Sequence, residues 1–262
     1  MRKNFWTIGK HLLPESPLSA VIITLNEAPR IRDCLNSVSF CDEVVVVDSG
    51  STDGTVEICK EMGAVVISQT WLGYGAQKQF AVEQSSHDWV LCLDADERLS
   101  EQLVDSIQNF MKAPEGNACV MPRCNRFMGR WLRYGEGYPD LSLRLFNRNF
   151  AAWSQDPVHE KVHFVGEPLK LPGDILHCSE ESIGQYLEKQ NRYTSLQAEV
   201  LFKEGKSISI AKLVLSPLVR FLKFYFVRQG FRDGLPGLVH ISIGCFNSFI
   251  KYAKTLAMKK SV

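Results

Sequence analysis

Apolar runs typical of strands alternate with helix-like segments between Leu18 and about Val120. The pattern predicts strands over 18–24, 43–48, 64–68, 89–94 and 118–121, and helices over 28–38, 55–62, 75–85 and 100–111. Strands and helices that alternate at this spacing form a mostly parallel sheet with helices on both faces. We therefore expect an α/β fold whose ligands bind at the carboxyl ends of the strands.

Polar residues follow three of the predicted strands. The clusters are Thr24-Leu-Asn-Glu27, Asp48-Ser-Gly-Ser-Thr-Asp53 and Asp94-Ala-Asp-Glu97. Any one of them could be an ordinary turn, since Asn, Asp and Ser end strands in many proteins. Three clusters that converge on one edge of a sheet indicate a binding site there instead.

Asp94 and Asp96 are two carboxylates that follow an apolar strand. Such a pair suits Mg²⁺ or Mn²⁺, which take their other ligands from water and substrate phosphates. An EF-hand loop is excluded because Arg98 and Leu99 replace its last Asp or Asn and its Gly. Arg98 also argues against an aspartate phosphatase, and the loop after the first strand lacks the glycines of a sugar nucleotidylyltransferase.

Three motifs together resemble family 2 glycosyltransferases with the GT-A fold. They are Val21-Ile-Ile-Thr-Leu-Asn-Glu27, Val45-Val-Val-Asp-Ser-Gly-Ser-Thr-Asp-Gly-Thr55 and Leu91-Cys-Leu-Asp-Ala-Asp-Glu97. Leu143-Arg-Leu-Phe146, Pro157-Val-His-Glu160 and Leu176-His177 are similar to a narrower branch, the lipopolysaccharide inner-core β-1,4-glucosyltransferases. The resemblance covers about residues 18–200, and for that branch it implies UDP-glucose as donor and a heptose as acceptor.

The resemblance implies a set of residues around a UDP-sugar donor. Asp48 would accept a hydrogen bond from the uracil, Asp94 and Asp96 would hold the ribose and a divalent metal, and His177 would complete the metal site. Lys78 could reach the diphosphate or could be a solvated helix lysine, and His177 could equally be a structural histidine. The expected donor-site residues are Thr24, Asn26, Glu27, Asp48, Asp53, Lys78 and Asp94, with Asp94, Asp96 and His177 as ligands of Mn²⁺ or Mg²⁺.

Inverting sugar transfer needs one general base to remove the proton of the attacking hydroxyl. Glu160, after His159, matches a recurrent His-Glu pair of the branch, and Asp140 is the competing candidate. His159 would orient or pack rather than react. The chain has no Gln-x-x-Arg-Trp motif of processive relatives, so we expect the addition of a single sugar.

Arginines alternate with aromatic residues between residues 123 and 137. This composition could bind nucleic acid or form a plain surface loop. An acceptor loop is favoured, since Arg suits the phosphates and carboxylates of a core saccharide and aromatic faces suit sugar rings. We therefore expect no nucleic-acid partner and predict these acceptor-binding residues: Arg123, Arg126, Trp131 and Arg133.

The formal net charge of +1 hides an uneven distribution. Residues 211–262 carry nine Lys or Arg and one Asp, so they have a charge of +8 and the rest has −7. Apolar runs over 208–226 and 235–256 contain too many cations for a spanning helix and too many apolar side chains for a solvated one. We expect helices that lie on anionic lipid, or alternatively pack on the catalytic domain or on a partner.

These patterns divide the chain into a GT-A domain over 1–205 and a basic helical tail over 206–262. The uncharged window 234–250 is too short for a confident spanning helix. Lys10 and His11 interrupt the first apolar stretch, which argues against a signal peptide. The eight cysteines form no CxxC pair, and we expect them to be buried free thiols.

The sequence thus predicts an inverting, metal-dependent hexosyltransferase at the cytoplasmic face of the inner membrane. Its partners would be a UDP-hexose, a lipid-linked saccharide and the anionic membrane surface. One alternative is transfer to a polyprenyl phosphate, whose ionised oxygen needs no base. Another is a membrane-surface scaffold without activity, against which the intact Asp94 and Asp96 argue.

Overall fold

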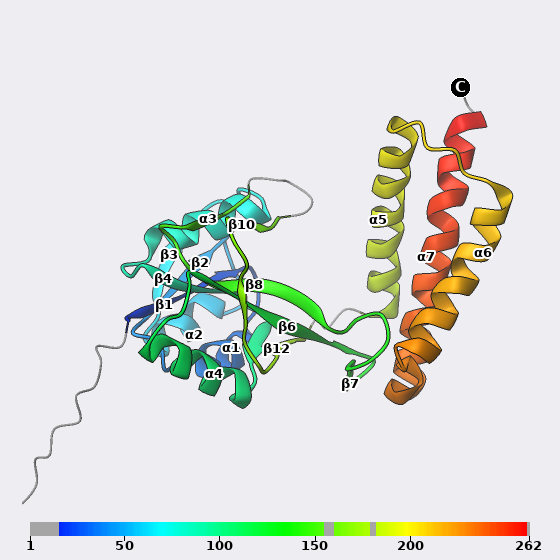
Figure 1. Cartoon of the computed structure of the whole chain (residues 1–262). Helices are drawn as coiled ribbons and strands as arrows, with labels where there is room; N and C mark the ends of the chain where they lie inside the picture. The colour runs from blue at the N-terminus through cyan, green and yellow to red at the C-terminus, as the bar shows by residue number, and fades with distance from the viewer. Residues whose placement is uncertain (1–15, 155–159, 179–181, 261–262) are drawn as a thin grey trace, which may run out of the picture. The chain divides into compact units, whose positions relative to one another are not determined.

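The computed structural model describes residues 16–154, 160–178 and 182–260, which form two compact units (Figure 1). The sheet unit comprises residues 1–121 and 141–175, and the helical unit comprises residues 122–140 and 176–262. This division differs from the predicted boundary after residue 205. Helix α5 (Ile183–Lys203), which we expected in the GT-A domain, packs along α7 (Gly234–Lys260) in the helical unit.

The sheet has the order β3-β2-β1-β4-β8-β6-β12-β5. Its first four members pair in parallel, and β8 runs antiparallel to β4. Register places Thr24 beside Asp48 and Ile23 beside Asp94, so the ends of three strands are aligned. The strands are β1 (Leu18–Thr24), β2 (Glu43–Asp48), β3 (Val65–Ser68), β4 (Trp89–Asp94), β5 (Glu97–Leu99), β6 (Ala118–Phe127), β8 (Asp140–Asn147) and β12 (Ile175–His177).

Alternating side chains of the central strands feed two apolar cores, one on each face of the sheet. Ile22 of β1 packs in the core that also contains side chains of α1 (Ile31–Ser37), α2 (Thr55–Glu61) and α4 (Glu101–Lys112). Val21 packs on the other face, with α3 (Tyr74–Gln84) and β9 (Ala151–Trp153), which pairs with β10 (Val162–Phe164). Figure 1 shows α3 and β10 on the opposite face from α1, α2 and α4. The predicted α/β sheet with helices on both faces is therefore confirmed.

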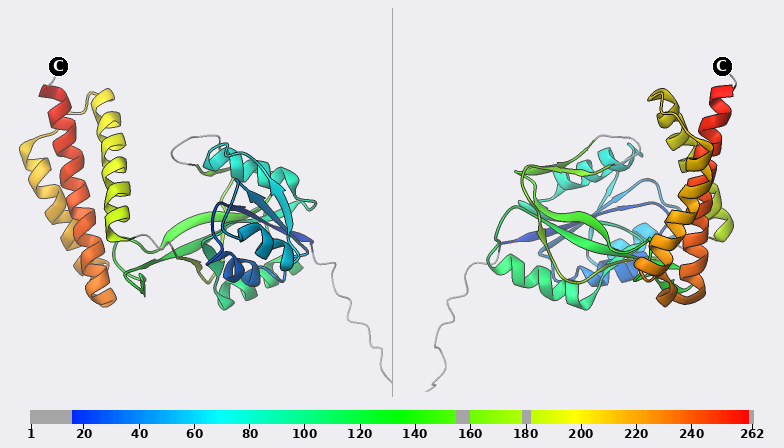
Figure 2. Two further views of the ribbon diagram at one scale, coloured as in Figure 1. Left: turned by 180° about the vertical axis from the view of Figure 1, so that it is seen from behind. Right: turned by 45° about the vertical axis from the view of Figure 1, so that its right-hand side comes forward.

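The helices of the helical unit are α5, α6 (Ile210–Phe221) and α7, and both α5 and α6 pack along α7 (Figure 2). A π-helical turn (Leu222–Val227) and a 3₁₀ turn (Gly230–Asp233) connect α6 to α7. Asp233 is buried and accepts hydrogen bonds from the backbone N–H groups of Arg133 and Tyr134 at 3.0 and 2.9 Å. The strand β7 (Arg130–Trp131) pairs with the end of β6, and β11 (Leu169–Lys170) pairs with its start.

Most predicted helices and strands agree with the structure to within a few residues. Strand β6 is longer than expected, continuing to Phe127, and β5 was not predicted because only three residues form it. All eight cysteines are free, and five of them are buried as expected: Cys34, Cys59, Cys92, Cys119 and Cys124. Within the described ranges, no helix combines the length and the apolarity needed to cross a membrane. The N-terminal stretch on which the signal-peptide prediction depends lies outside these ranges.

Candidate active site

The loops after β1 and β2 are held together by hydrogen bonds between their polar residues. The Asn26 N–H donates to Ser51 Oγ at 2.8 Å, and Asn26 Oδ1 accepts from the N–H of Thr52 at 2.8 Å. Asn26 adopts a φ of 55°, in the left-handed region that Asn tolerates better than most residues. The first two predicted donor motifs therefore form one connected edge of the sheet.

The carboxylates of Asp48 and Asp53 accept hydrogen bonds from the loops at this edge of the sheet. Asp48 is buried and accepts hydrogen bonds from the N–H groups of Gly50 and Ser51, each at 2.9 Å. Asp53 accepts from Ala28 N–H at 3.0 Å and from the hydroxyl of Thr55. These contacts are those of loop-shaping residues, and uracil binding by Asp48 stays a prediction.

Asp94 lies at the centre of a cluster of buried charges. Lys78 Nζ is 3.1 Å from Asp94 Oδ1, and Arg144 Nη2 is 3.2 Å from Asp94 Oδ2. Burial alone would raise the pKa of Asp94, but the charges of Lys78 and Arg144 outweigh it and hold that pKa well below its ordinary value. Arg144 also reaches Glu97 Oε1 at 3.0 Å. Asp94 is therefore ionised and held in one orientation from two sides.

Lys78 connects this cluster to the candidate base. Its ammonium lies 3.3 Å from Glu160 Oε1, and its side chain is only 4% exposed, which excludes the alternative of a solvated lysine. The ring of Trp153 is 4.9 Å from Lys78 Nζ and 5.6 Å from the Arg144 guanidinium carbon, so one aromatic side chain contacts both cations. The His159 prediction lies outside the described residues.

Gly75, in the first turn of α3, permits this arrangement. A Cβ atom at that position would lie 2.0 Å from the carbonyl oxygen of Ser154 and 3.3 Å from Glu160 Cβ. Helix α3 therefore approaches the backbone of Ser154 more closely than any residue with a side chain allows. This approach is what brings Lys78 within reach of Glu160.

Several carboxylates lie on the side of this edge that Asp96 occupies. Burial raises the pKa of Glu27, and the neighbouring charges of Asp96 and Asp53 add to that rise against the effect of Arg30. Thr24 Oγ1 is buried without a hydrogen-bond partner among the described residues. Carboxylate and hydroxyl oxygens are hard donors, which fit Mg²⁺ or Mn²⁺. Among the described residues, however, no three His, Cys, Asp or Glu side chains form a ready-made ligand group.

The remaining predicted site residues belong to the helical unit. Asp140 forms an ion pair with Arg123, whose Nη2 lies 2.9 Å from Asp140 Oδ2. His177 Nδ1 lies 2.8 Å from Asn125 Oδ1, the contact of an oriented side chain, and its role as a metal ligand stays a prediction.

The predicted acceptor arginines are arranged around the β6–β7 hairpin. The Arg126 guanidinium carbon lies 6.0 Å from the ring of Trp131, its partner across the hairpin. Arg133 contributes its backbone N–H to Asp233. An arginine beside an aromatic ring is compatible with the predicted acceptor loop. These contacts do not test acceptor binding, which stays a prediction.

Sequence reasoning did not identify Arg144, Glu97 and Trp153 as members of the cluster. Arg144 was visible as a charge inside the apolar run Leu143-Arg-Leu-Phe146, and Glu97 directly follows the Asp94 motif. A charged residue within a buried strand requires a partner, so Arg144 carried a signal. The sequence holds no comparable signal for Trp153, because only the packing of β9 against α3 brings this side chain near Lys78.

The model of one protein family, glycosyl transferase family 2, matches residues 19–164, which include Asp94, Asp96 and Glu160. The chain belongs to glycosyltransferase family 2. The glycosyltransferase is 38% identical over 250 residues to the uncharacterized glycosyltransferase RT0209 of Rickettsia typhi (strain ATCC VR-144 / Wilmington), covering 90% of this chain and 86% of that protein. It is also 34% identical over 256 residues to the lipopolysaccharide core biosynthesis glycosyltransferase LpsC of Rhizobium meliloti (strain 1021), covering 93% of each.

A solved structure with the same fold is the mannosyltransferase PcManGT from Pyrobaculum calidifontis, in complex with GDP-Man and Mn²⁺. The TM-score is 0.52 at 15% sequence identity, and the match covers 98% of this chain and 90% of that one. The family and the fold expected from the three motifs are thus confirmed, and the chain is a glycosyltransferase with a GT-A domain.

Proposed function

We propose that this glycosyltransferase is an inverting, metal-dependent hexosyltransferase that transfers a sugar, glucose in our proposal, from a UDP-hexose to a heptose of the lipopolysaccharide core. The observation that carries the proposal is the position of Lys78, whose ammonium contacts both Asp94 of the donor motif and Glu160. A carboxylate suited to proton removal therefore lies one side chain away from the predicted donor site. The likeness to LpsC, a lipopolysaccharide core glycosyltransferase by name, supports the acceptor class.

In this proposal, the strand edge binds the donor. Asn26, Glu27 and the loop after β2 surround the nucleoside, and Asp94 accepts hydrogen bonds from the ribose. Asp94 suits that task because Lys78 and Arg144 fix it as a carboxylate, an acceptor of hydrogen bonds only. The positive charge of Lys78 would also stabilise a diphosphate bound next to Asp94.

Glu160 takes the proton of the acceptor hydroxyl as that oxygen attacks the anomeric carbon. Its side chain is 24% exposed, so an acceptor can reach it, and Lys78 orients it from the buried side. Asp140 suits the task less well because Arg123 already pairs with its carboxylate.

Asp96, together with Asp94 and with His177 as a further predicted ligand, would hold a divalent metal ion. The carboxylates near Asp96 fit a hard cation, and the structure of PcManGT is of a complex with GDP-Man and Mn²⁺. When bound, such an ion would neutralise the charge that develops on the leaving diphosphate.

The helical unit would hold the enzyme on the cytoplasmic face of the inner membrane. Helix α6 has no buried residue, and its apolar side chains are largely exposed, among them Ile210 at 78% and Val219 at 62%. Exposed apolar side chains beside several lysines suit the interface of an anionic bilayer.

Replacement of the two candidate bases tests this reaction. We expect Glu160→Gln to lower kcat about 10²–10⁴-fold with UDP-glucose and a lipopolysaccharide core acceptor, because the attacking hydroxyl loses its base. UDP binding should persist. The matched variant Asp140→Asn should change kcat far less. If neither variant slows transfer, base catalysis is excluded, and an ionised acceptor such as a polyprenyl phosphate takes its place.

A further inference from the structure

A groove in the helical unit combines apolar walls with several positive charges. It lies between α6 and α7, and its cavity volume is about 580 Å³, within the range of small-molecule sites. Leu215, Val219, Phe224 and Tyr252 supply apolar surface, while Lys212, Lys223 and Lys251 border it. In the part of the chain that the structure describes, no carboxylate lines this groove.

The three lysines contact aromatic rings. Lys212 Nζ lies 5.2 Å and Lys251 Nζ 4.8 Å from the ring of Tyr252, and Lys223 Nζ lies 5.4 Å from Phe224. A cation over an aromatic face keeps its full charge. The groove therefore offers positive charge without a counterion of its own beside an apolar surface, which suits an anionic group attached to a hydrocarbon chain.

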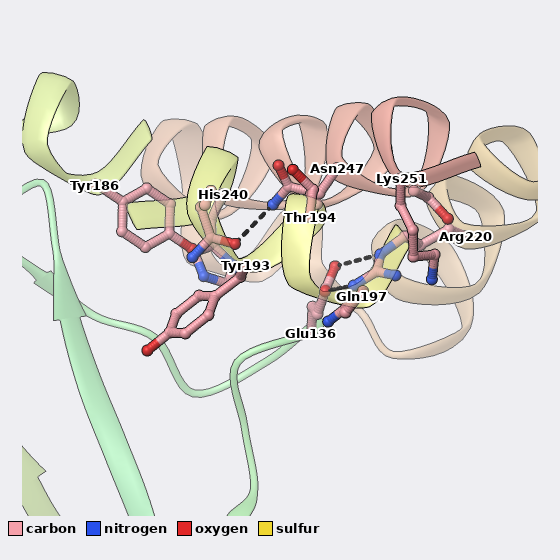
Figure 3. Close-up of a pocket in the computed structure, with 12 residues that line it drawn as sticks. Glu136, Tyr186, Tyr193, Thr194, Gln197, Arg220, His240, Asn247 and Lys251 are labelled. Carbon is pink, nitrogen blue, oxygen red and sulfur yellow. Dashed lines mark hydrogen bonds and ion pairs between the residues drawn. The ribbon is translucent and has the colours of Figure 1, made fainter. Parts of the chain in front are cut away.

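A polar pocket of about 260 Å³ adjoins this groove. Figure 3 shows the side chains that line the pocket. Amide and hydroxyl groups dominate its walls, which also contain the ion pair of Glu136 and Arg220. Asn247 Nδ2 donates to Gln190 Oε1 at 2.8 Å, so α7 and α5 are joined across the pocket. Many neutral donors and acceptors in a small concave site suit a polyhydroxylated ring.

The pocket and the groove share three lining residues: Arg220, Ser248 and Lys251. We infer that the two cavities together bind one phosphorylated glycolipid. Its acyl chain lies in the groove, its phosphate lies beside Lys251 and Lys212, and its sugar ring occupies the polar pocket. Charge complementarity selects this occupant, because neither a neutral glycolipid nor a free sugar uses the lysines.

This inference rests on the proposed function, since it describes how a lipid-linked acceptor is held. It assigns that task to the helical unit and to residues different from the predicted acceptor residues of the β6–β7 hairpin. It also differs from general attraction to an anionic surface, because it requires a sugar and a phosphate in the same ligand.

Vesicle binding by the full-length protein tests the site without donor or metal. One set of phosphatidylcholine vesicles contains lipid A, a phosphorylated glucosamine disaccharide with acyl chains. A second set contains phosphatidylglycerol at the same surface charge, and a third contains a neutral galactolipid. We expect lipid A vesicles to bind most tightly. Lys251→Gln should weaken that binding about fivefold, the effect of one cation near an anionic surface, and Gln197→Leu should reduce the preference for lipid A over phosphatidylglycerol.

Lys203→Gln is the matched control, because Lys203 is exposed at the end of α5 and lines neither cavity. Lys223→Gln is a second test variant, at an exposed position of the groove, and it should weaken lipid A binding by about the same fivefold. Equal affinity for lipid A and phosphatidylglycerol vesicles would overturn the inference, as would equal losses in the Lys203 and Lys251 variants. A protein that selects lipid A but transfers no sugar to a core acceptor would instead contradict the proposed function alone.

Discussion

The two units of the molecule use positive charge in opposite ways. In the sheet unit, Lys78 and Arg144 are almost completely buried, and each contacts two carboxylates. In the helical unit, Lys212 and Lys223 are exposed and lie against aromatic rings beside an apolar groove. Buried, paired charges fix the geometry of neighbouring side chains, whereas exposed cations without carboxylates remain available to a ligand.

This difference matches two requirements that the proposed transfer to a lipid-linked acceptor would impose. The donor site must hold a small set of carboxylates in place, and a buried ion pair does so because either partner alone would be costly to bury. The acceptor side must attract a large anionic substrate, and surface charge serves that purpose. Substitutions of the same chemical type should therefore have different consequences in the two units.

Arg144→Met should produce the largest loss of stability. The substitution leaves Asp94 and Glu97 without a shared cation in the interior, and breaking a buried pair in this way costs about 3–5 kcal/mol. Chemical denaturation would measure the free energy of unfolding. Arg32→Met is the matched control, because Arg32 pairs with Glu61 at an exposed position and should contribute less than about 1 kcal/mol. Similar losses in both variants would show that the Arg144 cluster does not organise the site.

Gly75→Ala should have an intermediate effect and should also slow transfer. The new methyl group would collide with the Ser154 carbonyl, and overpacking of about 1–3 kcal/mol outweighs the better helix propensity of Ala, about 1 kcal/mol. Movement of Ser154 and Glu160 away from α3 would separate the proposed base from Lys78. Stability and kcat are measured together.

Gly184→Ala provides the control for that variant. Gly184 occupies the same second position of its helix, α5, and a Cβ there would have its nearest neighbour at 3.7 Å. We expect this variant to gain up to about 1 kcal/mol. If Gly75→Ala is equally harmless, the close approach of α3 does not position Glu160.

The sheet unit was more predictable from the sequence than the helical unit. Strand β1 and its loop are local features, since apolar periodicity and the polar residues at 24–27 are visible in the chain itself. The contact between Lys78 and Glu160 joins residues 82 positions apart, and only the family resemblance suggested that both belong to the site. The position of α5 could not be predicted from the sequence. Hydrophobic periodicity shows that a helix has an apolar face, but it does not show which other helix packs against that face.

Binding to vesicles should show the smallest effects, because exposed charges act through solvent. The full-length protein should bind anionic vesicles more tightly than neutral ones, by about fivefold for each engaged lysine. Added salt should weaken this binding without abolishing it, since charges are screened within ~8 Å at physiological salt while the apolar side chains of α6 stay buried in the lipid. Cosedimentation at increasing salt measures both components. Equal binding to neutral and anionic vesicles would show that the positive charge of the helical unit does not contribute to membrane binding.

In the proposed function, the carboxylates at the strand edge bind the donor together with a divalent metal ion. Calorimetric titration of UDP in the presence of Mn²⁺ tests it directly, with the wild type compared with Asp96→Ala and with Asp105→Ala, an exposed carboxylate of α4. Replacing an outer-shell partner of a metal already costs about 10–100-fold in affinity. We therefore predict a loss of at least about tenfold for Asp96→Ala and none for Asp105→Ala, with both variants folded. Unchanged UDP affinity in the Asp96 variant would show that Asp96 does not hold a metal ion that the donor needs.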